Sequence, residues 1–109
     1  MPDNMMPSDP SEFLFYETED GRTRLQVRME GETVWLSHRD MAELFQTTKQ
    51  NVNLHIQNIF DEGELTPEAN VKDYVTVQTE GSRQVERRVA HCNLDVIISV
   101  GYRVKSLRV

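Results

Sequence analysis

The stretch that decides the fold is residues 37–60, which read SHRDMAELFQTTKQNVNLHIQNIF. Its apolar residues follow a helical period in two blocks, with a short polar segment between them. In the first block Ser37 is suited to cap a short helix, and Asp40 follows three residues on. The second block is predicted to begin near Thr48, and Gly63 is placed to end it in a left-handed cap. The pattern therefore predicts two consecutive helices joined by a tight turn.

Spacing within this stretch is typical of a helix-turn-helix. A small residue in the first helix lets the second helix approach, and an apolar residue about ten positions later closes the contact. Ala42 and Val52 fill these two positions. Two residues depart from the pattern, because Gln46 stands where the turn commonly has glycine and His55 occupies an expected apolar position. The stretch predicts a module of the DNA-binding type rather than an enzyme.

The start of the second helix is rich in side chains that can hold or read DNA. Asn and Gln pair with adenine, Lys reaches guanine or phosphate, and Thr contacts the thymine methyl group or phosphate. The contacts expected from this region are Thr47, Thr48, Lys49, Gln50, Asn51 and Asn53. The alternative is that these polar side chains face water, as they do on many helices of a bundle.

The residues before this stretch predict a mobile tail and a small sheet. Residues 1–11 contain three of the four prolines and are read as the tail. Three runs, 13–18, 24–29 and 33–36, have strand character and are separated by turns that contain glycine. Alternation in the second run places Leu25, Val27 and Met29 on one face and Arg24, Gln26 and Arg28 on the other. We expect an antiparallel meander whose apolar face is covered by the helices that follow.

After the second helix the sequence predicts a polar connection over 65–72, a β-hairpin from 73–79 and 84–90, and a last helix over 93–104. The last helix begins at an Asn cap and is so apolar that it is expected to be largely buried. The chain stops directly after it. We therefore expect residues 12–109 to be one domain and the N-terminal part of a longer protein.

A helix-turn-helix that is followed by a β-hairpin has the winged-helix plan. The predicted fold class is thus α+β and winged helix-turn-helix-like. Arg83 at the hairpin tip and Arg87 on its second arm are the expected contacts of the wing with the DNA backbone or minor groove, and Arg88 falls on the opposite face from Arg87. The alternative is that these arginines protect an exposed edge strand from pairing with another chain.

Composition is compatible with this interpretation. The 109 residues carry a net charge of −6, but residues 82–109 hold six basic and two acidic side chains, so the chain can present a basic face. The single cysteine, Cys92, and the lack of a long apolar run or signal peptide predict a cytoplasmic protein without a membrane partner. No residue pattern commits the chain to a catalytic site, a metal site or a cofactor.

Three separated stretches of the chain resemble the RhuM virulence-associated family of bacteria. They are residues 35–65, which include QNVNLHIQNIF at 50–60, residues 77–83 (VQTEGSR) and residues 93–104 (NLDVIISVGYRV). Members of this family are longer than this chain, are similar to phage-type Bro-N modules and are usually described as DNA-binding or pathogenicity-island proteins. The resemblance implies no catalytic residues.

The favoured partner is double-stranded DNA, bound by a regulator that acts as a homodimer, with the helix over 48–60 in the major groove. A second hypothesis is a protein-interaction or oligomerisation module that uses the acidic surface and the apolar final helix. A third makes the domain the recognition part of a larger enzyme or toxin. Fold analogy alone does not choose between these functions.

Overall fold

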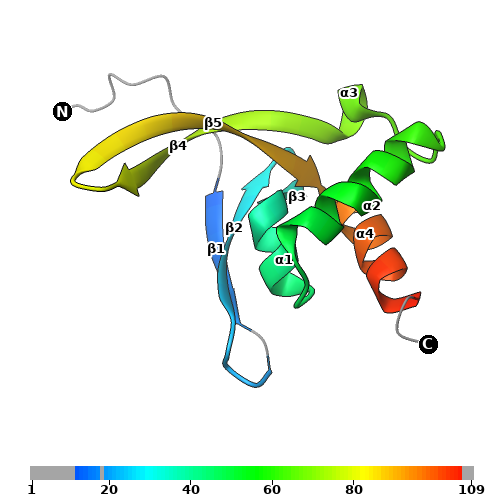
Figure 1. Ribbon diagram of the computed structural model, residues 1–109, viewed down its shortest axis with the longest axis horizontal. Coiled ribbons are helices and arrows are strands. Elements are labelled where there is room, and N and C mark those ends of the chain that lie inside the picture. Colours follow the sequence, from blue (N-terminus) through cyan, green and yellow to red (C-terminus); the bar gives the residue numbers. More distant parts are fainter. Residues whose placement is uncertain (1–11, 18, 107–109) are drawn as a thin grey trace.

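The computed structural model describes residues 12–17 and 19–106, apart from the side chain of Ser106. In this part of the chain five strands form one antiparallel sheet in the order β1-β2-β3-β5-β4, and four helices accompany it (Figure 1). The expected α+β class is confirmed. The predicted tail at residues 1–11, and Thr18 at the end of the first predicted strand, lie outside the described residues.

The predicted meander is present as β1 (Glu12–Glu17), β2 (Arg24–Glu30) and β3 (Thr33–Ser37), which pair antiparallel in sequence order. Gly31 and Glu32, the two residues of the turn between β2 and β3, both have positive φ (64° and 65°), as a type I′ hairpin turn requires. Leu36 of β3 belongs to the core formed with the helices and Val27 of β2 packs against that core, whereas every residue of β1 is exposed. The expected helical cover therefore reaches only two of the three strands.

The other face of β2 is also covered, which the alternating pattern did not predict. Arg28 was expected on a polar face but is only 8% exposed. Its guanidinium lies over the ring of Tyr74 at 4.0 Å and over that of Phe13 at 4.7 Å. The carboxylate of Glu30 accepts hydrogen bonds from the Tyr74 hydroxyl and, at 2.7 Å, from Lys72. Aromatic rings thus bury the cation, because each ring offers a negative face to it.

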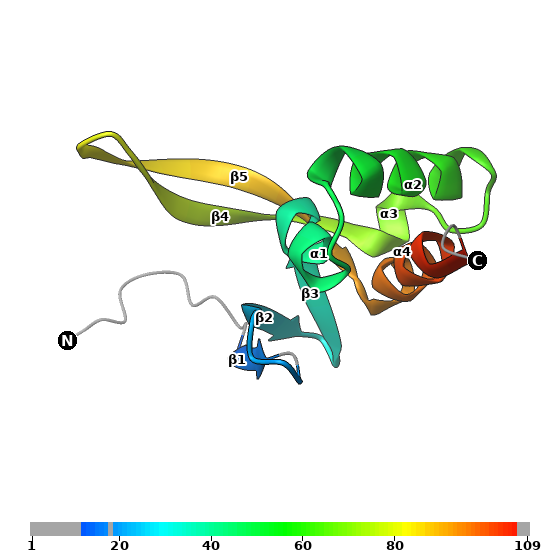
Figure 2. The same cartoon turned by 60° about the horizontal axis from the view of Figure 1, so that its bottom comes forward.

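The predicted hairpin consists of β4 (Val71–Glu80) and β5 (Arg83–Asn93), and it extends away from the helices (Figure 2). The structure joins it to the meander in one sheet, because His91, Cys92 and Asn93 of β5 pair with β3. Residues 83–90 of β5 pair with β4 alone. Both strands are longer than expected. The predicted polar connection is also wrong in part, since it contains a short helix, α3 (Pro67–Asn70), with proline at its start.

The two predicted helices are α1 (His38–Leu44) and α2 (Lys49–Asp61), and both begin at the expected caps. Ser37 Oγ accepts a hydrogen bond from the backbone N–H of Asp40 at 3.1 Å, and Thr48 Oγ1 accepts one from that of Asn51 at 3.0 Å. These bonds satisfy N–H groups that the first turn of each helix leaves unpaired.

Both helices end in the same hydrogen-bonded motif, but only one of them uses glycine. After α2, the N–H groups of Gly63 and Glu64 reach back to the carbonyls of Phe60 and Ile59, and Gly63 has φ 76°. After α1, the N–H groups of Gln46 and Thr47 bond in the same way, to the carbonyls of Glu43 and Ala42, and Gln46 has φ 56°. Gln46 therefore adopts the left-handed conformation that the usual turn glycine supplies.

Replacing Gln46 with glycine is expected to stabilise the domain by about 0.5–1 kcal/mol, because a Cβ in the left-handed region costs roughly 1 kcal/mol. The substitution also removes two exposed side-chain hydrogen bonds, to Glu43 O (2.7 Å) and Thr23 Oγ1 (3.2 Å), which limits the gain. Gly63→Ala at the matching position of α2 should instead destabilise by a similar amount. Urea unfolding measures the change in the free energy of unfolding for each variant. Changes of the same sign and size in both would contradict this account.

The last helix, α4 (Leu94–Ser106), starts as predicted at Asn93, whose Oδ1 accepts a hydrogen bond from the N–H of Val96 at 3.4 Å. The expectation that this helix is largely buried is confirmed for one face only. Its inner face is buried, but Leu94, Ile98 and Tyr102 are 41%, 57% and 77% exposed. The helix packs against β3, β5 and α2, and no described element covers its outer apolar face.

The core lies between the helices and the inner face of the sheet. Its buried side chains come from β3, α1, α2, β5 and α4, and they are Leu36, Met41, Ala42, Val52, Ile56, Ile59, Cys92, Val96, Ile97, Val100 and Val104. Ala42 and Val52, the pair expected at the helix contact, are both among them. Within the described ranges, no helix has the length and apolar character needed to cross a bilayer.

Candidate nucleic-acid interface

The outer face of α2 presents a row of polar side chains to solvent. Lys49, Gln50, Asn53 and Gln57 are exposed, together with Leu54. Gln57 lies one turn beyond Asn53 and was not among the expected contacts. A helical projection of the sequence could have found it, because residues 50, 53 and 57 share one face. This face is the part of α2 that a ligand can reach.

Three of the expected contacts, Thr47, Thr48 and Asn51, belong to the turn rather than to this face. Asn51 is half-buried, and its Nδ2 donates a hydrogen bond to Thr47 Oγ1 at 2.9 Å. Thr48 is engaged as the cap of α2. These three side chains fix the angle at which α2 leaves α1, so their place in the fold is structural.

Asn53 is held by a chain of polar contacts that links three elements. Its Oδ1 lies 2.6 Å from His38 Nδ1, and because an amide oxygen only accepts, the imidazole carries its proton on Nδ1. The other ring nitrogen, Nε2, then accepts from the thiol of Cys92, 3.8 Å away. Burial raises the pKa of Cys92 to about 12, so the thiol keeps its proton. These contacts occupy the amide oxygen of Asn53, so its NH₂ group is the part of this side chain that can donate to a ligand.

Beside α2 lies a polar cleft of about 380 Å³ that we call the basic cleft. It is bordered by the starts of α1 and α2 and by the hairpin, and its lining is Ser37, His38, Arg39, Lys49, Gln78, Arg88, Val89 and Ala90. Three cations from three elements therefore meet there: Arg39 of α1, Lys49 of α2 and Arg88 of β5. The lining includes no acidic side chain. Among the described residues none of the three cations forms an ion pair.

The hairpin arginines differ in how free they are to bind a ligand. Arg87, an expected contact, forms a two-pronged ion pair with Glu80, through Nε at 2.9 Å and a terminal nitrogen at 2.8 Å. This bond raises the pKa of Arg87. Arg83 is exposed beside the hairpin turn, as expected. Arg88 lies in the basic cleft, so the structure brings it, with Arg39, to the site in place of Arg87.

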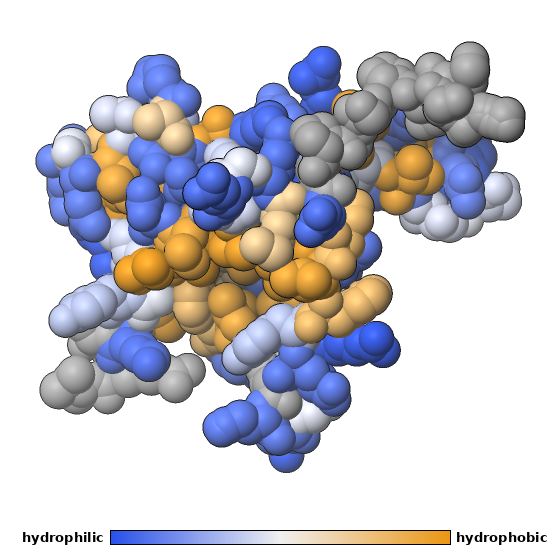
Figure 3. Space-filling model, turned by 180° about the vertical axis from the view of Figure 1, so that it is seen from behind, coloured by the Kyte–Doolittle hydropathy of each residue, from blue (hydrophilic) through white to orange (hydrophobic). Residues whose placement is uncertain are grey.

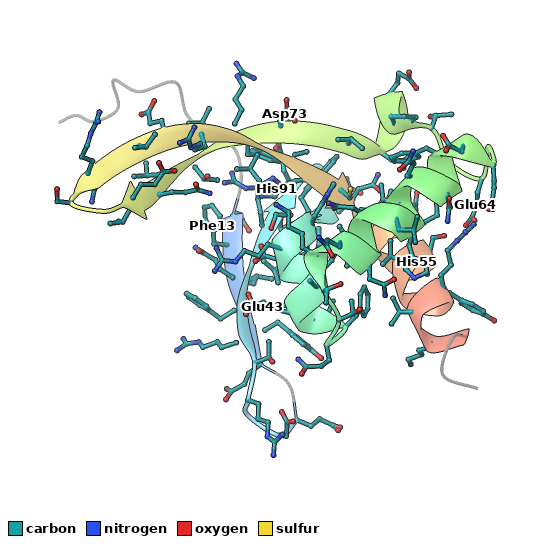
Figure 4. The ribbon with its side chains drawn as sticks, in the orientation of Figure 1. Phe13, Glu43, His55, Glu64, Asp73 and His91 are labelled. Carbon is teal, nitrogen blue, oxygen red and sulfur yellow. The ribbon has the colours of Figure 1, made fainter. Side chains whose placement is uncertain are left out.

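Two buried histidines give the domain a dependence on pH. Figure 4 shows His55 on α2 and His91 on β5, both in the interior. Burial lowers the pKa of His55 below its usual value of 6.5, and Arg103 lowers this pKa further. Burial also lowers the pKa of His91, against the raising effect of its hydrogen bond to the Val89 carbonyl. His55 Nε2 has no hydrogen-bond partner among the described residues.

Stability is expected to fall as the pH drops below 6.5. In that range the unfolded chain binds protons at these histidines while the folded chain does not. The loss is at most about 1.4 kcal/mol per pH unit for each group. Urea unfolding from about pH 7.5 to about pH 5.5 measures it. His55→Leu should remove part of this slope and retain the fold, because the position lies on the apolar face of α2. An unchanged slope in this variant would contradict a role for His55.

The fold and the cleft define an α+β protein with a helix pair and a hairpin that together border a basic site. Residues 69–109 match the family model of the Virulence protein RhuM family, and this match supports the family membership that the resemblance implied. The matched range covers β4, β5 and α4 and therefore includes Arg88 but not α1 or α2. No curated protein and no solved structure matches the chain.

Proposed function

We propose that this domain binds double-stranded DNA and is not an enzyme. The observation that carries the proposal is the basic cleft, whose lining includes Arg39, Lys49 and Arg88 and no acidic side chain. Three exposed cations on one cleft offer a positively charged surface to an anion. DNA supplies such anions as a regular row of phosphates.

The position of the cleft favours duplex DNA over a small anion. Lys49 lies at the start of α2, whose exposed face continues with Gln50, Asn53 and Gln57. Amide side chains of this kind make paired hydrogen bonds to adenine in the major groove. In a helix-turn-helix the second helix enters the groove while neighbouring residues hold the backbone. In this proposal α2 is the recognition helix, the three cations of the cleft each contact a backbone phosphate, and the β4–β5 hairpin acts as the wing.

The charge distribution limits how the DNA is bound. The net charge of −6 opposes non-specific attraction, so binding has to depend on the local cluster rather than on the whole surface. Arg83 at the hairpin tip extends the basic surface beyond the cleft. We expect a small number of phosphate contacts and correspondingly a moderate dependence on salt.

The test is selection of bound duplexes from a random DNA pool at low and at moderate salt. The proposal predicts enrichment of related sequences by the wild-type domain. Gln50→Ala should relax the sequence preference at one position, because Gln50 is exposed on the face of α2. The matched change Asn51→Ala removes an amide that bonds to Thr47, so it should weaken folding rather than base preference. Lack of any salt-sensitive binding to any duplex would overturn the proposal.

A further inference from the structure

An apolar groove runs across the molecule from β1 and β2 past α1 to α4. It consists of two adjoining hollows of about 540 Å³ and about 270 Å³, which share Leu44 and Ile97 in their linings. Phe45, Ile98 and Tyr102 border the larger hollow, and Tyr16 borders the smaller one. Figure 3 shows a broad hydrophobic area on this side of the molecule. We call the two hollows and their borders the apolar groove.

The exposed apolar area at the groove is large for a domain of this size. Tyr16, Leu94, Ile98 and Tyr102 are 48%, 41%, 57% and 77% exposed. Since a large apolar side chain offers roughly 150–250 Å² when fully accessible, these four leave on the order of 450 Å² of surface in water. The largest apolar patch of a typical monomer is about 300–600 Å² and is often functional. The groove therefore lies in the middle of the range of apolar patches that are often functional.

This area is close to what a stable dimer needs. A standard interface buries about 800 Å² on each partner, and about 65% of a homodimer interface is apolar. The apolar part is therefore on the order of 500 Å² for each copy, which is near the exposed area of the groove.

The shape and the charge of the groove both suit a second copy of the same chain. Ile98 and Tyr102 form a ridge, and the larger hollow lies directly beside it. A two-fold contact brings the same patch of both copies together, so the ridge of one copy can enter the hollow of the other. Lys105 is the single charged residue in the two linings, and neither lining has an acidic side chain. The two linings therefore bring no carboxylate into the contact, whereas Asp95 and Glu64 lie at its rim, in a neighbouring hollow that Ile98 and Tyr102 also border.

We infer that the domain forms a two-fold homodimer through the apolar groove, with the outer face of α4 at the centre of the contact. This inference goes beyond DNA binding and does not depend on it. The groove and the basic cleft share no lining residue, so assembly leaves the cleft accessible. Dimerisation also explains why α4 is apolar on its outer face, a property that burial in the monomer does not account for.

Sedimentation equilibrium on the intact chain, from low to high micromolar concentration, tests the inference. The wild-type chain is expected to be dimeric. Ile98→Glu and Tyr102→Ser should each raise the dimer dissociation constant by about 100-fold, since central apolar residues dominate interface energies. Leu54→Glu is the matched control, because Leu54 is 55% exposed on α2 and lies outside the groove. It should leave the dimer intact.

Circular dichroism of each variant separates dissociation from unfolding. If Ile98→Glu unfolds, Tyr102→Ser still tests the inference, because Tyr102 is 77% exposed and its replacement leaves the core unchanged. A wild-type chain that stays monomeric at the highest concentration overturns the inference. So does a dimer that persists in folded groove variants, or one that Leu54→Glu dissociates equally. These outcomes leave the DNA proposal untouched, and a failed DNA selection leaves the dimer untouched.

Discussion

Replacing the three cleft cations with glutamine (Arg39→Gln, Lys49→Gln and Arg88→Gln together) is expected to weaken binding to duplex DNA by roughly two to three orders of magnitude at about 0.1 M salt. Each phosphate contact contributes about 0.9 to the slope of log K against log salt, so the slope should decrease in magnitude by about 2.7. The three side chains are exposed, and none has an ion-pair partner among the described residues, so the fold should persist. Fluorescence titration of a labelled duplex at several salt concentrations measures both quantities.

A control with the same change in net charge separates the cleft from charge in general. Arg22→Gln, Arg24→Gln and Arg87→Gln remove three cations that do not line the cleft. Arg87 is already paired with Glu80, and Arg24 lies over the ring of Phe15 at 4.4 Å. This control variant should retain most of the affinity. Equal losses in both triple variants would show that overall charge, and not the basic cleft, accounts for the binding.

Truncation of Ile59 is expected to have the largest effect on stability. Ile59 of α2 is fully buried in the core, and Ile59→Ala should lower the free energy of unfolding by about 3 kcal/mol through lost transfer energy and the cavity that remains. This is a large share of the roughly 5–15 kcal/mol that stabilises a typical domain. Thermal unfolding should shift downward by roughly 15 °C, since 1 kcal/mol corresponds to about 4–8 °C in a domain of this size.

Leu54 provides the comparison within the same helix. It is 55% exposed, so Leu54→Ala should change the free energy of unfolding by less than about 0.5 kcal/mol. The two substitutions change helix propensity by amounts that agree to within about a few tenths of a kcal/mol. The difference between their unfolding free energies therefore reports the difference in burial. Urea unfolding followed by Trp35 fluorescence measures the two values. Similar losses in both variants would contradict the assignment of Ile59 to the core.

The helix pair could be predicted from the sequence because its determinants are local. The caps at Ser37 and Thr48 and the helical spacing of the apolar residues all lie within a few residues of the bonds they form. The sequence also marked Gln46 as a departure from the usual turn glycine. The structure shows that Gln46 adopts the left-handed backbone conformation that this position requires. The hairpins were predicted for the same reason, since glycine marks their turns.

Features that depend on distant parts of the chain were not predicted. The pairing of β3 with β5 joins residues 35–37 to residues 91–93, and no local pattern specifies such a pair. Arg28 looked like a solvent-facing residue of an alternating strand, but Tyr74 from a distant strand covers it. The sequence predicted that α4 would be largely buried, but its outer face is exposed. Hydropathy shows that a side chain is apolar, but it does not show whether another element covers that side chain.

The site was predicted in part for similar reasons. Lys49, Gln50 and Asn53 could be assigned to an exposed helix face from sequence, and the structure places all three there. The basic cleft could not be predicted, because Arg39, Lys49 and Arg88 are brought together only by the packing of three elements. Arg87 and Arg88 are adjacent in sequence, but in the structure Arg87 pairs with Glu80 whereas Arg88 lines the basic cleft.

The β4–β5 hairpin is firmly held at one end only. It joins the rest of the sheet through His91–Asn93, while the part that ends at Gly81 is a two-stranded ribbon, and such a ribbon is marginally stable alone in water. Its outer half is therefore able to open locally while the core stays closed, and amide hydrogen exchange should become slower from the tip toward His91. Arg88 lies nearer the firm end and Arg83 at the loose one. The part of the hairpin that carries Arg88 is thus rigid before a ligand binds. The tip that carries Arg83 can adjust its shape to a ligand, and it loses conformational entropy when it does so.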